Sequence, residues 1–117
     1  MIQAAFVFDS QNRVKAFQMT GHADYAEKGE DIICSAVSAI CQTVIGTLTE
    51  FLKVGKDMSF TAEEGKIACR INDYDCLTDR VKISAEALMF SSYIGIKQIK
   101  LAEGQRYLSI VKVEEDS

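Results

Sequence analysis

The sequence predicts an α+β protein in which a mainly antiparallel five-stranded sheet and two long helices form a two-layer sandwich, in the order ββαββαβ. Three observations support this fold class. Two long stretches carry apolar residues at helical spacing, five short stretches are rich in strand-forming residues, and turn-forming residues join four of those strands in pairs. The chain has 117 residues, of which 48% are hydrophobic and 26% charged, so we expect one soluble domain over residues 1–117.

The first half of the chain is predicted to contain a hairpin and a long helix. Residues 2–8 and 13–19 read as strands, because Asp-Ser-Gln-Asn between them supplies turn chemistry. After a polar loop, apolar residues recur at helical spacing from Asp31 to about Val54, with Asp31 as the N-cap and Gly55 as the stop. This helix is apolar nearly all round. We therefore expect a sheet on one side of it and a helix or a second subunit on another.

The second half repeats this layout. Residues 58–71 form a second hairpin around the turn 63–66, which contains a glycine. Thr78 is a candidate N-cap for a helix over about 79–103. Alternation of side chains over residues 106–113 predicts the last strand.

The charge of the chain restricts its partners. Thirteen basic and seventeen acidic residues give a net charge of −4, which argues against direct binding of nucleic acid and suits a basic peptide or protein. The N-terminal residues lack the pattern of a signal peptide. The uncharged run 32–49 contains Ser, Gln and Thr, so it favours a buried helix over a membrane span. We expect a cytoplasmic protein without a membrane partner.

The cysteine pattern gives no sign of a metal site or cofactor. Cys34 and Cys41 are separated by six residues, as are Cys69 and Cys76, and this is not a recognised zinc or redox spacing. The chain has one histidine. We expect reduced cysteines, no metal and no cofactor.

That histidine, His22, lies twelve positions before Cys34. If Asp31 caps the helix, Cys34 falls in the first turn, where free N–H groups and the helix dipole lower the pKa of a thiol. A His–Cys pair there would be a minimal nucleophile and base for acyl transfer, with first-turn amides as an oxyanion hole. The alternative is a buried structural thiol near a surface histidine, because cysteine is often a core residue. Spacing alone leaves both interpretations open.

A longer motif around these residues resembles a known family. The sequence reads GHA at 21–23 and GEDIICSAVS at 29–38. This resembles the signature of the ribosomal-processing cysteine protease family, Prp, which is approximately GHA, a short loop and G-x-D-I-V-C-A-A-V-S. The departures are Ile33 for Val and Ser35 for Ala. The length and element order also fit, so the resemblance covers essentially the whole chain.

The resemblance implies a homodimeric cysteine endopeptidase. Its substrate would be the precursor of a basic large-subunit ribosomal protein, whose N-terminal extension ends in paired aromatic residues. Cys34 would be the nucleophile, and His22 the general base and acid, acting through a thioester acyl-enzyme. Two rival functions remain: a thiol-dependent amidase or acyltransferase acting on a small molecule, and a non-enzymatic binding protein in ribosome assembly.

Three further residues are candidates for supporting roles. Gly21 would allow close backbone approach or a positive φ beside the histidine. Asp31 is either a helix cap, which could accept the N–H of Cys34, or a partner that orients His22. Ser38 lies one turn beyond Cys34, where its hydroxyl would face the same site or bond back to the helix backbone.

Two other segments have an open role. The acidic loop 23–30 is either a solvated connection or a lid over the dyad that attracts a basic substrate. Met89, Phe90 and Tyr93 either form a pocket for the paired aromatics or belong to the core.

Overall fold

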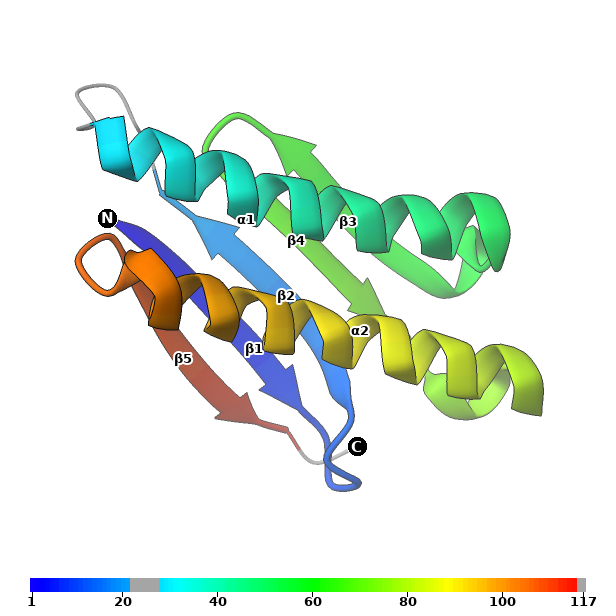
Figure 1. Cartoon of the computed structure of the whole chain (residues 1–117). Helices are drawn as coiled ribbons and strands as arrows, with labels where there is room; N and C mark the ends of the chain where they lie inside the picture. Colours follow the sequence, from blue (N-terminus) through cyan, green and yellow to red (C-terminus); the bar gives the residue numbers. More distant parts are fainter. Residues whose placement is uncertain (22–27, 116–117) are drawn as a thin grey trace.

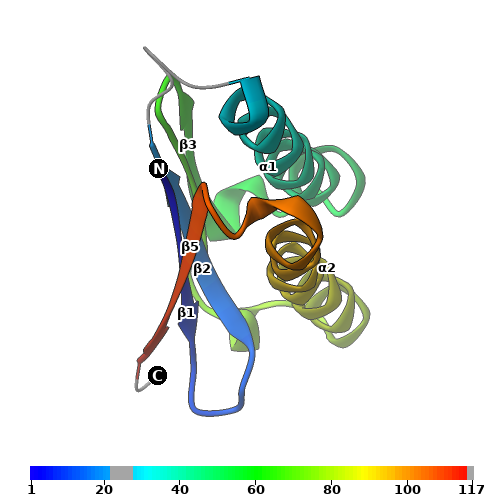
Figure 2. The ribbon, with the colours of Figure 1, turned by 60° about the vertical axis from the view of Figure 1, so that its left-hand side comes forward.

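The protein is a two-layer arrangement in which two helices cover one face of a five-stranded sheet (Figures 1 and 2). The computed structural model describes residues 1–21 and 28–115. The strands are β1 (Ile2–Phe8), β2 (Val14–Thr20), β3 (Met58–Glu63), β4 (Lys66–Ile71) and β5 (Leu108–Glu114). The helices are α1 (Lys28–Gly46) and α2 (Asp79–Ile99). A π-helical turn extends each of them, η1 (Thr47–Phe51) after α1 and η4 (Lys100–Gly104) after α2. Two short 3-10 turns are η2 (Gly55–Asp57) and η3 (Tyr74–Cys76).

The sheet order is β3-β4-β2-β1-β5. Neighbouring strands are antiparallel except for β1 and β5, which are parallel. The predicted α+β sandwich and element order are therefore confirmed, and the sheet is mixed because one of its edge pairs is parallel. One face of the sheet packs on the helices, and the other is not covered by any described element (Figure 2).

The predicted bounds of the first helix are wrong at both ends. The helix already includes Lys28, so Asp31 lies in its first turn and is not an N-cap. Two contacts hold this earlier turn in place. Gly29 packs closely on the Tyr107 ring, since a Cβ there would lie 3.0 Å from it, and Glu30 pairs with the amino group of Met1. At the other end the helical stretch stops before Lys53, which takes a left-handed φ of 57°.

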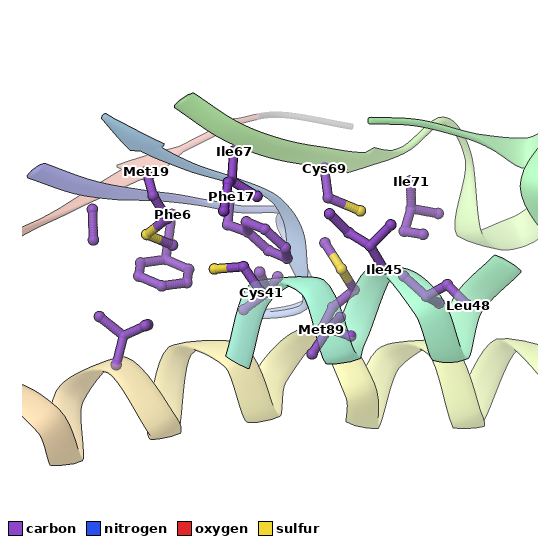
Figure 3. Close-up of a cluster of buried hydrophobic side chains, with 14 of the residues drawn as sticks. Phe6, Phe17, Met19, Cys41, Ile45, Leu48, Ile67, Cys69, Ile71 and Met89 are labelled. Carbon is purple, nitrogen blue, oxygen red and sulfur yellow. The ribbon is translucent and has the colours of Figure 1, made fainter. Parts of the chain in front are cut away.

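The core lies between the sheet and the helices (Figure 3). Its largest fully buried side chains include Phe6, Phe17 and Leu48. Cys41 and Cys69 are also buried there, and burial raises the pKa of each thiol to about 12. These two cysteines are core residues and poor nucleophiles.

The residues considered as a pocket for aromatic groups belong to α2 and face this core. Met89 is fully buried. Phe90 and Tyr93 pack edge-to-face on Phe8, with ring centroids 6.0 and 5.1 Å away. The core alternative is therefore correct for all three.

The first helical stretch is long and apolar. Its stretch Gly29–Phe51, with a mean hydropathy of 1.7, could cross a membrane by length and composition alone, as can the core helices of soluble proteins. In this fold its apolar residues Ile33, Val37 and Val44 are buried in the core.

Candidate active site

A cleft of about 470 Å³ opens between the first half of α1 and the β3–β4 hairpin. Cys34, Val37, Ser38 and Gln42 line it from the helix. Its apolar floor comes from the strands, through Ile2, Met19 and Ile67. Its opposite wall is the end of the hairpin, residues 62–65. Ligand pockets for small molecules and short peptide segments commonly have this size.

Cys34 faces the cleft from the second turn of α1, where it is half-buried. Residues four apart lie on the same side of a helix, so Cys34, Ser38 and Gln42 form one row along the cleft. The Ser38 hydroxyl accepts a hydrogen bond of 3.2 Å from the Gln42 side-chain amide. Two roles were considered for Ser38, and the structure places its side chain at the same cleft as Cys34.

Gly21 marks the point where the chain leaves β2 at the edge of the cleft. It has a φ of 154°, and a Cβ there would lie 2.8 Å from the carbonyl oxygen of Met1 and 2.9 Å from the Cα of Ile2. Its N–H donates to the carbonyl oxygen of Gly65, 3.2 Å away, across the cleft wall. Both expected reasons for a glycine, close backbone approach and positive φ, are therefore present.

His22 and the loop 23–27 lie outside the described residues. The structure thus brings Gly21, Cys34 and Ser38 to one cleft and does not test the dyad or the lid. Asp31, which is exposed, lies in the first helical turn, where a carboxylate interacts favourably with the helix dipole. The cap role proposed for Asp31 is wrong, because the helix begins before it.

The electrostatic surroundings of Cys34 differ from the prediction. Burial, together with the carboxylates of Glu30 and Asp31, raises the pKa of the Cys34 thiol above its usual value, outweighing the opposite effect of the Met1 amino group. The expected lowering required Cys34 to sit in the first turn, next to the free N–H groups. Because the helix starts earlier, Cys34 lies in its second turn, away from those groups, and Glu30 and Asp31 occupy the first turn.

Removing these two charges is expected to make Cys34 more reactive. With Glu30→Gln and Asp31→Asn together, the pKa of the thiol falls, the thiolate fraction at neutral pH rises, and iodoacetamide alkylates Cys34 faster. The rate is measured by mass spectrometry in a Cys76→Ala background, since Cys76 is exposed. Asp79→Asn, in the first turn of the other helix, is the matched control and leaves the rate unchanged. An equal or slower rate in the double variant would show that the two carboxylates do not govern this thiol.

Several lining residues could not be found from sequence. The turn 63–66 was expected, but nothing local indicates that it meets α1, because that depends on strand order. Gln42 gave no signal either, although its spacing of eight from Cys34 places it on the same helix face. Among the described residues, no group of three or more His, Cys, Asp and Glu side chains is placed to hold a metal ion.

The fold and the cleft define a small α+β protein with a thiol facing a peptide-sized groove. The family model described as "Cysteine protease Prp" matches residues 1–108, and the chain therefore belongs to this family. A ribosomal processing cysteine protease Prp of Bacillus subtilis (strain 168) is 33% identical over 63 residues, covering 49% of this chain. The match spans 56% of that relative, little more than half its length.

Solved structures of an essential ribosomal processing protease Prp from S. aureus share the fold. The complex with a substrate peptide has a TM-score of 0.75 at 17% identity, covering 96% of this chain and 99% of the other. The complex with a covalently linked product peptide has a TM-score of 0.74 at 18% identity, with the same coverage.

Proposed function

We propose that this protein is a cysteine endopeptidase that removes the N-terminal extension of a large-subunit ribosomal protein. The observation that carries the proposal is the position of Cys34. Cys34 stands in the segment that resembles the family signature, within the residues that the family model matches, and its thiol faces a cleft large enough for a peptide segment. The related S. aureus protein was crystallised with a substrate peptide and with a covalently linked product peptide, which supports peptide cleavage through a covalent intermediate.

In the proposed reaction Cys34 is the nucleophile and His22 the base and acid. The Cys34 sulfur attacks the scissile carbonyl carbon while His22 takes the thiol proton. The tetrahedral intermediate collapses, the C–N bond breaks, and His22 returns the proton to the leaving amine. Water, deprotonated by His22, then hydrolyses the thioester and releases the new carboxylate and the thiol.

The surroundings of the thiol favour a mechanism with a base. Burial and two carboxylates raise the pKa of Cys34, which favours the protonated thiol, so a base that accepts this proton during the attack would assist the reaction. His22 is the single imidazole of the chain. It directly follows Gly21, whose backbone is fixed at the edge of the cleft by its contacts with Ile2 and Gly65.

The charge around the cleft suits a basic substrate. Glu63 and Glu64 line the cleft at the hairpin, and Glu30 and Asp31 lie one turn before Cys34. A ribosomal protein precursor rich in Lys and Arg would be attracted to this rim.

We also propose that the protein acts in the cytoplasm as a homodimer. The four cysteines are free in the structure, in keeping with a reducing compartment. The homodimer proposal rests on the resemblance to the family; the exposed isoleucines of the two helices, Ile32, Ile83 and Ile94, are scattered and do not by themselves mark an interface.

A cleavage assay tests the function. A synthetic peptide spanning the extension and mature start of the ribosomal protein is incubated with the Cys76→Ala protein, with and without prior iodoacetamide treatment, and the products are identified by mass spectrometry. We expect a single cut after the paired aromatics that alkylation abolishes. Binding without cleavage supports a ribosome-assembly binding protein instead. Neither binding nor cleavage favours a thiol enzyme acting on a small molecule.

A further inference from the structure

The strand next to the candidate nucleophile is an edge of the sheet. β3 is the outermost strand and pairs only with β4 among the described strands. Its last residues, Ala62 and Glu63, line the same cleft as Cys34. The free edge of the sheet therefore runs into the candidate active site.

The hairpin geometry fixes which backbone groups point to that edge. Glu63 pairs with Lys66 across a two-residue turn that ends in Gly65, with a φ of 81°. In such a hairpin the pair next to the turn exchanges both hydrogen bonds, and bonded pairs alternate along the strand. The N–H and C=O groups of Glu63 and every second residue before it thus bond to β4, whereas those of Phe60 and Ala62 point outward.

The side chains of this edge suit another strand. Exposed sheet edges are usually protected by proline or by charge, and the opposite edge strand β5 carries Lys112 near its middle. β3 has no proline, and its stretch 58–62 has no charge. Phe60 is 52% exposed, although its cross-strand partner Cys69 is buried under the helices. An incoming strand with an apolar side chain would cover this ring.

From these observations, and resting on the proposed function, we propose that the substrate peptide binds as a sixth strand along β3. Its backbone pairs with the outward groups of Phe60 and Ala62, an apolar side chain packs on Phe60, and the scissile carbonyl reaches Cys34. The row from Cys34 to Gln42 is about 12 Å long. It therefore accommodates about four residues of extended peptide on one side of the scissile bond.

Amide hydrogen exchange measured by NMR tests this directly. Cys34→Ala protein is saturated with the synthetic junction peptide, and exchange rates are compared with those of the free protein. We expect exchange at Phe60 and Ala62 to slow by about tenfold or more. The amides of Ser59 and Thr61, already bonded to β4, are the internal control and change far less.

A backbone-modified substrate gives the independent readout. N-methylation of one peptide nitrogen at a time is expected to raise KM about fivefold at alternate residues only, within about four residues of the scissile bond. In the protein, Ala62→Pro removes an outward N–H at a position where an edge strand accepts proline. It is expected to raise KM by a similar factor with little change in kcat, and its Tm and Cys34 alkylation rate report whether the fold is kept.

The outcomes separate this inference from the function itself. If the peptide saturates the Cys34→Ala protein but exchange at Phe60 and Ala62 is unchanged, strand addition is wrong while the protease function stands. A second outcome would also overturn the inference: exchange at these amides is already slow before peptide is added, and becomes fast when the protein is diluted. The edge would then be covered by a second copy of the chain. If the wild-type protein neither binds nor cleaves the peptide, both proposals fail.

Discussion

Cys34→Ala protein is expected to lose cleavage of the junction peptide entirely, with kcat/KM falling by about a thousandfold or more. The physical reason is that no other thiol can replace Cys34. Cys41 and Cys69 are buried in the core with their pKa values raised to about 12, and Cys76 lies outside the cleft residues. Without a nucleophile next to the scissile carbonyl, no thioester forms.

The measurement compares three variants by quantitative mass spectrometry. His22→Ala is expected to lower kcat/KM by about a hundredfold to ten-thousandfold, the usual effect of losing a general base and acid. Cys76→Ala is the matched control, because it removes an exposed thiol without touching the cleft. Near-normal turnover by Cys34→Ala or His22→Ala, with an unchanged Tm, would refute the proposed dyad.

The two halves of the candidate site differ in how well the sequence reveals them. The GHA and GEDIICSAVS segments form a local, ordered motif, and their resemblance to the family signature predicted that Gly21, Cys34 and Ser38 belong to one site. In the fold these three residues line one cleft. The hairpin wall could not be assigned, because its contact with α1 results from strand order. Local sequence carries little information about which strand becomes the edge.

The helix start shows why a local signal can be wrong. Asp31 is a good N-cap residue, and its position before an apolar run predicted a helix beginning there. Tertiary contacts extend the helix backwards, since Gly29 fits against the Tyr107 ring and Glu30 pairs with Met1. Burial and the carboxylates of Glu30 and Asp31 then raise the pKa of Cys34, and the shift of one turn removes the lowering by free first-turn N–H groups that we expected. The start of the helix therefore depends on a tertiary contact of Gly29 with Tyr107, which rules for caps and periodicity do not predict.

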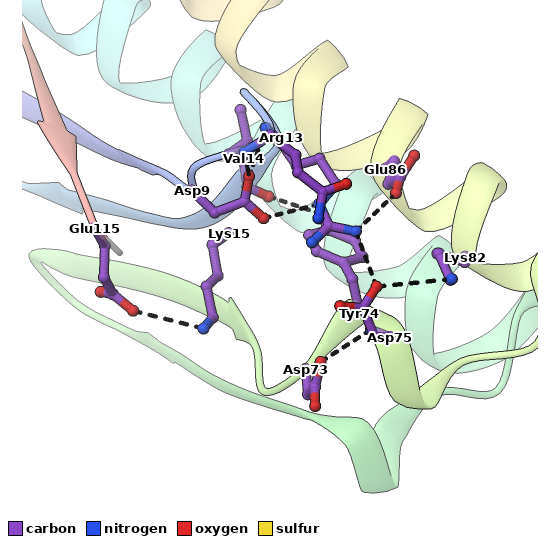
Figure 4. Close-up of polar contacts among 11 residues, drawn as sticks. Asp9, Arg13, Val14, Lys15, Asp73, Tyr74, Asp75, Lys82, Glu86 and Glu115 are labelled. Atoms are coloured by element: carbon purple, nitrogen blue, oxygen red, sulfur yellow. Dashed lines mark hydrogen bonds and ion pairs between the residues drawn. The ribbon is translucent and has the colours of Figure 1, made fainter. Parts of the chain in front are cut away.

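The other large expected effect concerns stability. It arises in a cluster of polar residues at the end of the sheet away from the cleft (Figure 4). The Asp9 side chain is 1% exposed and that of Arg13 is 11% exposed, with 2.8 Å between Asp9 Oδ2 and Arg13 Nε. The backbone N–H groups of Gln11 and Arg13 also donate to Asp9. Arg13 further bonds Glu86 on α2 and stacks over the Tyr74 ring, so it joins the β1–β2 turn to the helix layer.

Arg13→Met is expected to lower the free energy of unfolding by about 3–5 kcal/mol at neutral pH, because it leaves the buried Asp9 carboxylate without its charged partner. Urea unfolding followed by circular dichroism measures the change. Arg80→Met, at an exposed site on α2, is the control and changes stability by less than about 0.5 kcal/mol. Because Arg13 lies far along β1 and β2 from Cys34, kcat/KM of the folded variant is expected to equal that of the wild type.

The effect of Arg13→Met should depend on pH in a defined direction. Burial alone would raise the pKa of Asp9, but hydrogen bonds from the Arg13 backbone, the Arg13 side chain and Gln11 outweigh it and hold the pKa below its usual 3.8. A carboxyl with a lowered pKa in the folded state stabilises the protein above its unfolded pKa, and that contribution is lost as the pH falls through the folded value. Once Asp9 is protonated, the variant no longer buries an unpaired charge. The free energy of unfolding should therefore differ most between wild type and Arg13→Met at neutral pH, and this difference should shrink in acid. A difference that grows in acid would exclude the Asp9–Arg13 pair as its cause.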